Sequence, residues 1–158
     1  MNRAIVLVVA ALMMGISQMK AQTMIGKNNI TLKSDLMTPE ALWAMGRVSN
    51  PAASPDGKRI VYQVGYYSVK QNKGHQVLYI IDANGKNQKL LTTSDKRETD
   101  ASWMENGKRI AFLTGGQLWS MNPDGTDRRQ LTKSATEIEG YKFSPDGKYV
   151  ILIKSIPY

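Results

Sequence analysis

From residue 50 onward, short runs of apolar residues alternate with turns that contain glycine. The runs, such as residues 59–64 and 149–153, are rich in β-branched and aromatic side chains, which favour strands. The turns combine Pro, Asp and Gly. These residues reverse a chain because Pro fixes φ, Asp bonds to turn amides and Gly adopts positive φ. The alternation therefore predicts antiparallel hairpins.

The hairpins repeat along the chain. Turns of the Ser-Pro-Asp-Gly kind have their glycines at positions 57, 107 and 147, and a second kind of turn has glycines at 85 and 125. The last interval of each series is 40 residues, a period that holds four short strands, the size of one propeller blade. We therefore predict an all-β fold, a partial β-propeller of about two and a half four-stranded blades, preceded by a short N-terminal helix.

The predicted blades span about 50–92, 99–132 and 140–158, and the third has only its first two strands. The first period is ten residues longer than the second, and we place the additional residues around 67–74. Because propellers close with about four to eight blades, we expect this chain to be the amino-terminal part of a longer protein. The alternative is that the chain is a whole gene product, a remnant prone to aggregation or proteolysis.

The segment before the repeat, residues 22–49, is predicted to be a linker that contains one short helix at 38–46. Thr38 suits the N-cap and Pro39 suits the first helical position. Gly46 can end the helix.

The first 21 residues have the parts of a secretory signal peptide: a basic start at Arg3, an apolar run over 4–16 and a polar stretch that ends at Ala21. The apolar run is shorter than the roughly 20 residues that cross a membrane. We therefore predict cleavage near Ala21, no stable membrane span afterwards, and an exported protein that is periplasmic or secreted. The alternative is an uncleaved membrane anchor.

Composition narrows the chemistry. The chain has no Cys and one His, which excludes disulfides, thiolate nucleophiles and multi-histidine metal sites.

The net charge is +8, but the basic residues mostly follow turns, so we predict a solvated face and no nucleic-acid partner. These basic residues are Lys58, Arg59, Lys108, Arg109, Arg128, Arg129 and Lys148. A core role is predicted for the strand aromatics Tyr62, Tyr79, Phe112, Trp119, Phe143 and Tyr149.

Few residues could carry chemistry of their own. His75 lies in a polar segment and is interpreted as a solvated loop histidine. Residues 122–127 resemble part of a calcium loop but lack its terminal glutamate, so we predict a turn. Asn29 begins a glycosylation sequon, which we assign to linker. No Gly-x-Ser-x-Gly elbow occurs, and we predict no catalytic, cofactor-binding or metal-binding residue in this chain.

The repeat resembles that of a known family. Ser-Pro-Asp-Gly-Lys at 54–58 precedes an apolar strand, and an Asp or Asn turn with Gly and then Leu-Thr follows. This order resembles the WD-like propeller repeat of TolB-type periplasmic proteins and of prolyl oligopeptidase family serine peptidases. Residues 37–58 also resemble the start of secreted bacterial dipeptidyl or acylaminoacyl peptidases of that family. In such enzymes, the propeller covers an α/β-hydrolase domain and filters substrates by size.

The resemblance implies a non-catalytic propeller portion of an exported, dipeptidyl-peptidase-like serine exopeptidase. The propeller would gate peptide access to an α/β-hydrolase domain that this chain lacks, so the chain alone would be inactive. Peptide substrates would then be its partners, through that domain. The alternative is a TolB-like periplasmic scaffold that binds protein partners.

Overall fold

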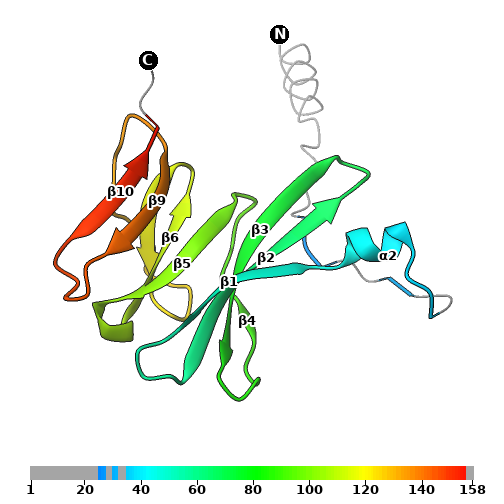
Figure 1. The fold of residues 1–158 in the computed structure, drawn as a ribbon, viewed down its shortest axis with the longest axis horizontal. Helices are drawn as coiled ribbons and strands as arrows, with labels where there is room; N and C mark the ends of the chain where they lie inside the picture. Colours follow the sequence, from blue (N-terminus) through cyan, green and yellow to red (C-terminus); the bar gives the residue numbers. More distant parts are fainter. Residues whose placement is uncertain (1–24, 28–29, 32–34, 156–158) are drawn as a thin grey trace, which may run out of the picture.

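The computed structural model describes residues 25–27, 30–31 and 35–155 (Figure 1). It contains two four-stranded sheets and one two-stranded sheet, all antiparallel, with one short helix before them. The sheets follow one another along the chain as partial propeller blades, so the predicted nearly all-β fold is confirmed. The predicted signal peptide and Asn29 lie outside the described residues.

Blade one has its strands in chain order. They are β1 (Arg47–Ala53), β2 (Arg59–Ser68), β3 (Lys73–Asp82) and β4 (Lys89–Leu90). The additional residues of this blade lengthen the hairpin, because β2 and β3 stay paired from Arg59 and Asp82 to Ser68 and Lys73. In the segment that we placed around 67–74, residues 67–68 and 73–74 are therefore strand, and residues 69–72 form the turn between them.

Blade two repeats the same order, and the third sheet contains two strands. Blade two comprises β5 (Glu98–Met104), β6 (Arg109–Thr114), β7 (Gln117–Met121) and β8 (Arg129–Gln130). A 3-10 turn, η1 (Glu105–Gly107), joins β5 to β6. The third sheet pairs β9 (Ile138–Phe143) with β10 (Val150–Lys154).

The hydrophobic core lies between successive blades. Phe112 and Ile110 of blade two are fully buried against Val61 and Leu78 of blade one. A second cluster joins blade two to the third sheet through Ile138. Each sheet therefore covers its apolar face with the next sheet, as stacked repeats do.

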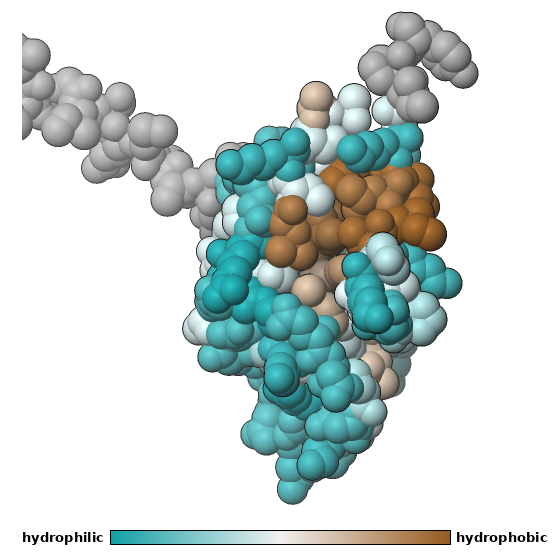
Figure 2. All heavy atoms as spheres, turned by 90° about the vertical axis from the view of Figure 1, so that its left-hand side faces the viewer, coloured by the Kyte–Doolittle hydropathy of each residue, from teal (hydrophilic) through white to brown (hydrophobic). Residues whose placement is uncertain are grey.

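The third sheet leaves apolar side chains exposed on its outer side. Figure 2 shows this hydrophobic area on the side of the molecule that β9 and β10 form. Val150, Ile151 and Ile153 of β10 are exposed there. Tyr149, which we assigned to the core, is 73% exposed because it precedes β10 at the turn, so that assignment is wrong.

The helix α2 (Pro39–Ala44) lies within the predicted range. Thr38 caps it, since the Thr38 side chain accepts a hydrogen bond from the Ala41 amide at 3.2 Å. Gly46 does not end the helix, because Met45 already leaves it in an extended conformation. A Cβ at Gly46 would lie 2.8 Å from side-chain atoms of Tyr66 and Val64, so close packing explains this glycine.

An aromatic contact fastens α2 to blade one. The Arg47 guanidinium lies 5.1 Å from the centre of the Trp43 ring and 4.5 Å from that of the Tyr67 ring, a cation–π arrangement.

Among the described residues, no helix has the length and apolar composition needed to cross a membrane.

Candidate functional site: a groove along the first strands

The first strands of the blades, β1, β5 and β9, lie beside one another (Figure 1). Between β5 and β9 runs a groove of about 450 Å³, which we call the inner groove. Its lining residues are Asp100, Ser102, Trp103, Glu139, Gly140, Tyr141, Lys142, Phe143 and Ile153. Carboxylates, a lysine and aromatic rings therefore share one open surface.

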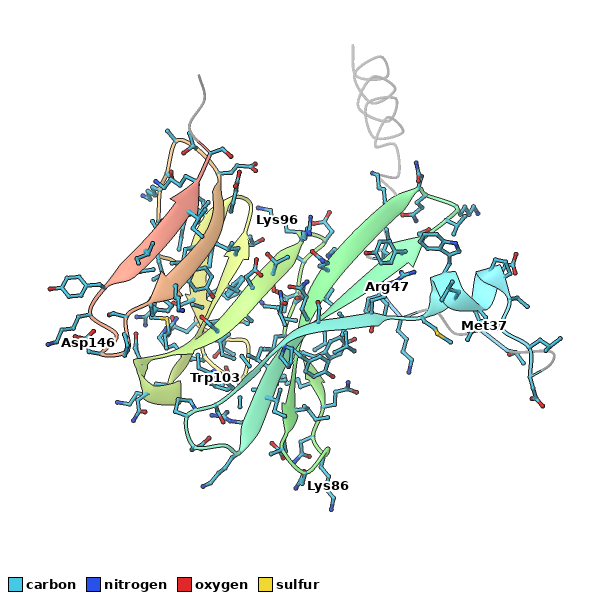
Figure 3. The ribbon with its side chains drawn as sticks, in the orientation of Figure 1. Met37, Arg47, Lys86, Lys96, Trp103 and Asp146 are labelled. Carbon is cyan, nitrogen blue, oxygen red and sulfur yellow. The ribbon has the colours of Figure 1, made fainter. Side chains whose placement is uncertain are left out.

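Matching irregularities join β1 to β5. Asn50 and Asp100 have positive φ angles of 48° and 52°, and the strand pairing of each shifts at that point. The Asn50 side-chain amide donates a hydrogen bond of 3.1 Å to the Asp100 carboxylate. Trp103, labelled in Figure 3, donates from its indole N–H to the carbonyl oxygen of Ala52 at 2.9 Å. These bonds fix one wall of the inner groove.

Tyr141 joins β5 to β9 at the floor of the groove. Its hydroxyl lies 2.9 Å from the Ser102 hydroxyl, 2.9 Å from the Ala111 carbonyl oxygen and 2.5 Å from the Asp100 carbonyl oxygen. Burial raises the pKa of the Tyr141 phenol. The phenol therefore stays protonated and acts as a donor that holds the strands together.

The inner groove lacks the arrangement of a serine hydrolase among its lining residues. Its one serine, Ser102, is hydrogen-bonded to the Tyr141 phenol, and no histidine lines the groove. A serine-hydrolase site needs a serine beside a general base. The groove presents hydrogen-bonding and aromatic groups on an open surface. That this chain contains no catalytic residue stays a prediction.

His75 is not a solvated loop histidine, as we had interpreted it. It lies on β3 and is buried, because the longer β2–β3 hairpin extends past it. Its ring nitrogens face the carbonyl oxygens of Ile25 and Lys96.

Two basic residues that we assigned to a solvated face are instead buried, as Arg109 is, or half-buried, as Arg128 is. The buried Arg109 guanidinium donates to the hydroxyl of Ser120 and to the Asp127 carboxylate, the latter at 2.8 Å. Arg128 donates to the Glu98 carboxylate at 2.6 Å and lies 5.1 Å from the centre of the Phe112 ring. The acceptors around Arg109 offset its burial, whereas Arg128 has acceptors for its two terminal nitrogens and its Nε atom is buried without a partner.

Residues 122–127 form the predicted turn. The Gly125 amide donates to the Asn122 carbonyl oxygen at 2.8 Å, and Gly125 has a φ of 87°. The Thr126 hydroxyl and amide hold the pKa of Asp124 below its usual value. Among the described residues, no three His, Asp or Glu side chains are arranged to hold a metal ion.

Sequence reasoning missed the residues that line the inner groove. One signal was present: Asn50 and Asp100 each stand seven residues before the turn glycines Gly57 and Gly107. Polar residues that tolerate positive φ at matching places in two repeats indicate a shared bulge. The partners of Tyr141 carry no such signal.

Two dipeptidyl-peptidases are similar to this chain in sequence. Over 130 residues, the chain is 40% identical to dipeptidyl-peptidase 5 of Porphyromonas endodontalis, a match that covers 80% of this chain and 19% of that protein. Over 162 aligned positions, it is 40% identical to dipeptidyl-peptidase 5 of Porphyromonas gingivalis, a match that covers all of this chain and 23% of the relative. The chain is homologous to a portion of dipeptidyl-peptidase 5. It thus spans about a fifth of the length of the dipeptidyl-peptidase 5 proteins.

Solved structures agree with a propeller fold. Pyrococcus horikoshii acylaminoacyl peptidase has a TM-score of 0.57 at 15% identity, over 70% of this chain and 17% of that chain. TolB from Acinetobacter baumannii has a TM-score of 0.53 at 25% identity, over 65% of this chain and 25% of that one. No protein-family model matches the chain. The segment therefore corresponds to the propeller-like region of peptidases homologous to dipeptidyl-peptidase 5.

Proposed function

We propose that this chain is the non-catalytic propeller portion of an exported serine exopeptidase of the dipeptidyl-peptidase type. In this proposal, its blades gate the access of peptides to an α/β-hydrolase domain elsewhere in the protein. The observation that carries the proposal is the 40% identity to dipeptidyl-peptidase 5, which in one relative extends over the whole chain. Export is supported by the signal-peptide pattern of residues 1–21.

The inner groove supplies a physical route for gating. Its carboxylates and Lys142 can meet the charged ends of a short peptide, and its aromatic rings can pack against apolar side chains. The strands on either side are fixed by the Asn50, Trp103 and Tyr141 hydrogen bonds. A rigid wall of this kind favours extended peptides that pass along the first strands and excludes folded chains.

The experiment compares the 158-residue chain with the complete product of its gene. We expect the DNA after the codon for Tyr158 to encode further 40-residue repeats and then a Gly-x-Ser-x-Gly elbow. The complete product should react with a fluorophosphonate probe and release dipeptides from peptide amino termini, and the 158-residue chain should do neither. The matched control is the complete product with its elbow serine changed to alanine. A gene without an elbow in any frame would overturn the proposal.

A second function has an observation of its own. The structural match to TolB is the one with the higher sequence identity, 25% against 15% for acylaminoacyl peptidase. A TolB-like scaffold would bind protein partners in the periplasm through its blades. A gene that continues for several blades and then stops without an elbow would favour this scaffold.

A further inference from the structure

His75 joins three segments that are distant in the sequence. It lies on β3 opposite Tyr66 of β2, and only 6% of its surface is exposed. Its Nδ1 atom is 3.0 Å from the carbonyl oxygen of Ile25, which belongs to the amino-terminal segment. Its Nε2 atom is 3.2 Å from the carbonyl oxygen of Lys96, which belongs to the connection between blades one and two and is labelled in Figure 3.

Both partners of the His75 ring are hydrogen-bond acceptors. A carbonyl oxygen only accepts, so each contact needs an N–H group on the ring nitrogen that faces it. A neutral imidazole has one N–H group, whereas the protonated ring has two. The neutral ring therefore satisfies one carbonyl and turns a lone pair toward the other. Only the protonated ring can hold both segments at once.

The two segments differ in how firmly they are held by other contacts. The connection at Lys96 is flanked by Glu98, which is buried and bonded to Thr92 and Arg128, and by Arg97, which donates to the Gln76 side chain. Among the described residues of the amino-terminal segment, Ile25 packs its side chain against the cluster around Tyr66. Because the described contacts around Ile25 are fewer than those around Lys96, we take the Ile25 carbonyl as the contact that the neutral ring loses.

We propose that His75 is a proton-operated latch that holds the amino-terminal segment onto blade one when protonated and releases it at Ile25 when neutral. The inference rests on the hydrogen-bonding geometry of His75 and is independent of the peptidase proposal. The contact between Ile25 and blade one then depends on the pH around the protein.

The charged residues near the ring are mostly basic, and Asp95 beside Lys96 is the acidic one in the connection. A pocket of about 220 Å³ beside His75 is lined by Tyr67, Gly74, Gln76 and Arg97 in addition to the ring, and none of these residues carries a carboxylate. Near the ring, the titratable or charged groups on the packed elements are Tyr66 and Tyr67 of β2, Lys73 of β3, Lys27 beside Ile25, and Asp95, Lys96 and Arg97 of the connection. The two carbonyl oxygens are the hydrogen-bond acceptors that face the ring nitrogens directly. Histidine gains or loses its proton between about pH 5 and 8, which sets the range for a test.

The test uses the full 158-residue chain. Because His75 is the one histidine of the sequence, a single imidazole signal in the NMR spectrum reports its protonation without ambiguity. Amide exchange, corrected for the intrinsic effect of pH, is measured over the same titration. We expect exchange in residues 25–27 to rise about five-fold as the imidazole loses its proton, as the loss of one hydrogen bond predicts. Exchange at β6 and β7 is the internal control and should stay constant.

The matched variant is His75→Gln, whose amide does not titrate. In this variant, exchange in residues 25–27 should no longer depend on pH across the same range. The proposal is overturned if exchange in the wild-type chain is the same with protonated and neutral His75. It is equally overturned if the pH dependence persists in His75→Gln. The wild-type measurement decides the matter even where the variant folds poorly.

Discussion

At the level of single residues, two turns of this chain contain matching hydrogen bonds between a serine, an aspartate and a lysine amide. Ser54 donates from its hydroxyl to the Asp56 carboxylate, which also accepts from the Lys58 amide at 3.1 Å. Ser144 and Asp146 repeat this arrangement in the third sheet. The hydroxyl and amide donors hold the pKa of each aspartate below its usual value.

The lowered pKa of Asp56 has a consequence for acid stability. A carboxylate with a lowered pKa in the folded state stabilises the fold above its ordinary pKa of about 3.9, and this contribution is lost as the pH falls through the lowered folded value. We expect Asp56→Asn to lower the urea midpoint at pH 7, and the difference from wild type to shrink toward zero as the pH falls below about 4. Asp35→Asn, an exposed change of the same charge outside a turn, is the control. A difference that is constant from pH 7 to pH 3 would contradict this account.

These turns could be predicted from the sequence because every atom involved lies within a few residues. His75 and Arg109 could not, because their partners are brought to them by the packing of strands. A basic residue after a turn looks the same in the sequence whether it is solvated, as Lys58 is, or buried, as Arg109 is.

At the level of elements, α2 is positioned by the small size of Gly46. Gly46 has no positive φ in the structure, so an alanine there would add no backbone strain. The Cβ atom of that alanine would, however, lie 2.8 Å from side-chain atoms of the buried residues Val64 and Tyr66. The sequence placed the helix correctly from its cap and its proline but could not show that its glycine is a contact to β2.

Gly46→Ala should therefore destabilise the fold by about 1–3 kcal/mol through overpacking. Gly65→Ala is a matched control on β2, since the nearest side-chain atom would lie 3.6 Å from its Cβ, an ordinary contact. Chemical denaturation of both variants measures the difference. Equal midpoints for the two alanine variants would show that α2 adjusts freely and that Gly46 has no packing role.

At the level of the whole molecule, hydrogen bonds from the Glu98–Arg128 ion pair of blade two reach the end of blade one. Glu98 of β5 is 1% exposed and accepts from the Thr92 hydroxyl at 2.8 Å and from Arg128 at 2.6 Å. Arg128 also donates to the Leu91 carbonyl oxygen at 2.7 Å. Because Leu91 and Thr92 close blade one, this network couples the end of one blade to the start of the next.

Removing the charge of Glu98 should uncouple the blades. We expect Glu98→Gln to lower the free energy of unfolding by about 3 kcal/mol, because Arg128 would keep its charge without a buried partner. Arg129→Gln, which breaks an exposed ion pair with Asp127, is the control and should change stability by less than about 1 kcal/mol. Urea unfolding followed by Trp fluorescence measures both. Equal losses in the two variants would contradict a coupling role for Glu98.

The period of the turns allowed the blades to be predicted, since each blade is one local unit of four strands. The contacts between blades could not be predicted in the same way. Leu91 and Arg128 are 37 residues apart, and Asp100 and Tyr141 are 41 apart, so only the stacking of the sheets brings them together. The inner groove therefore became visible only in the structure.

The strand order within each sheet also bears on how the molecule forms. Every strand pairs with its neighbour in the sequence, so each sheet needs only the closure of short loops. Short loops close within about 10–100 ns, and such local contacts favour rapid folding. Blade one can thus assemble while later segments of the chain are still being synthesised, and it then offers a finished surface on which blade two condenses.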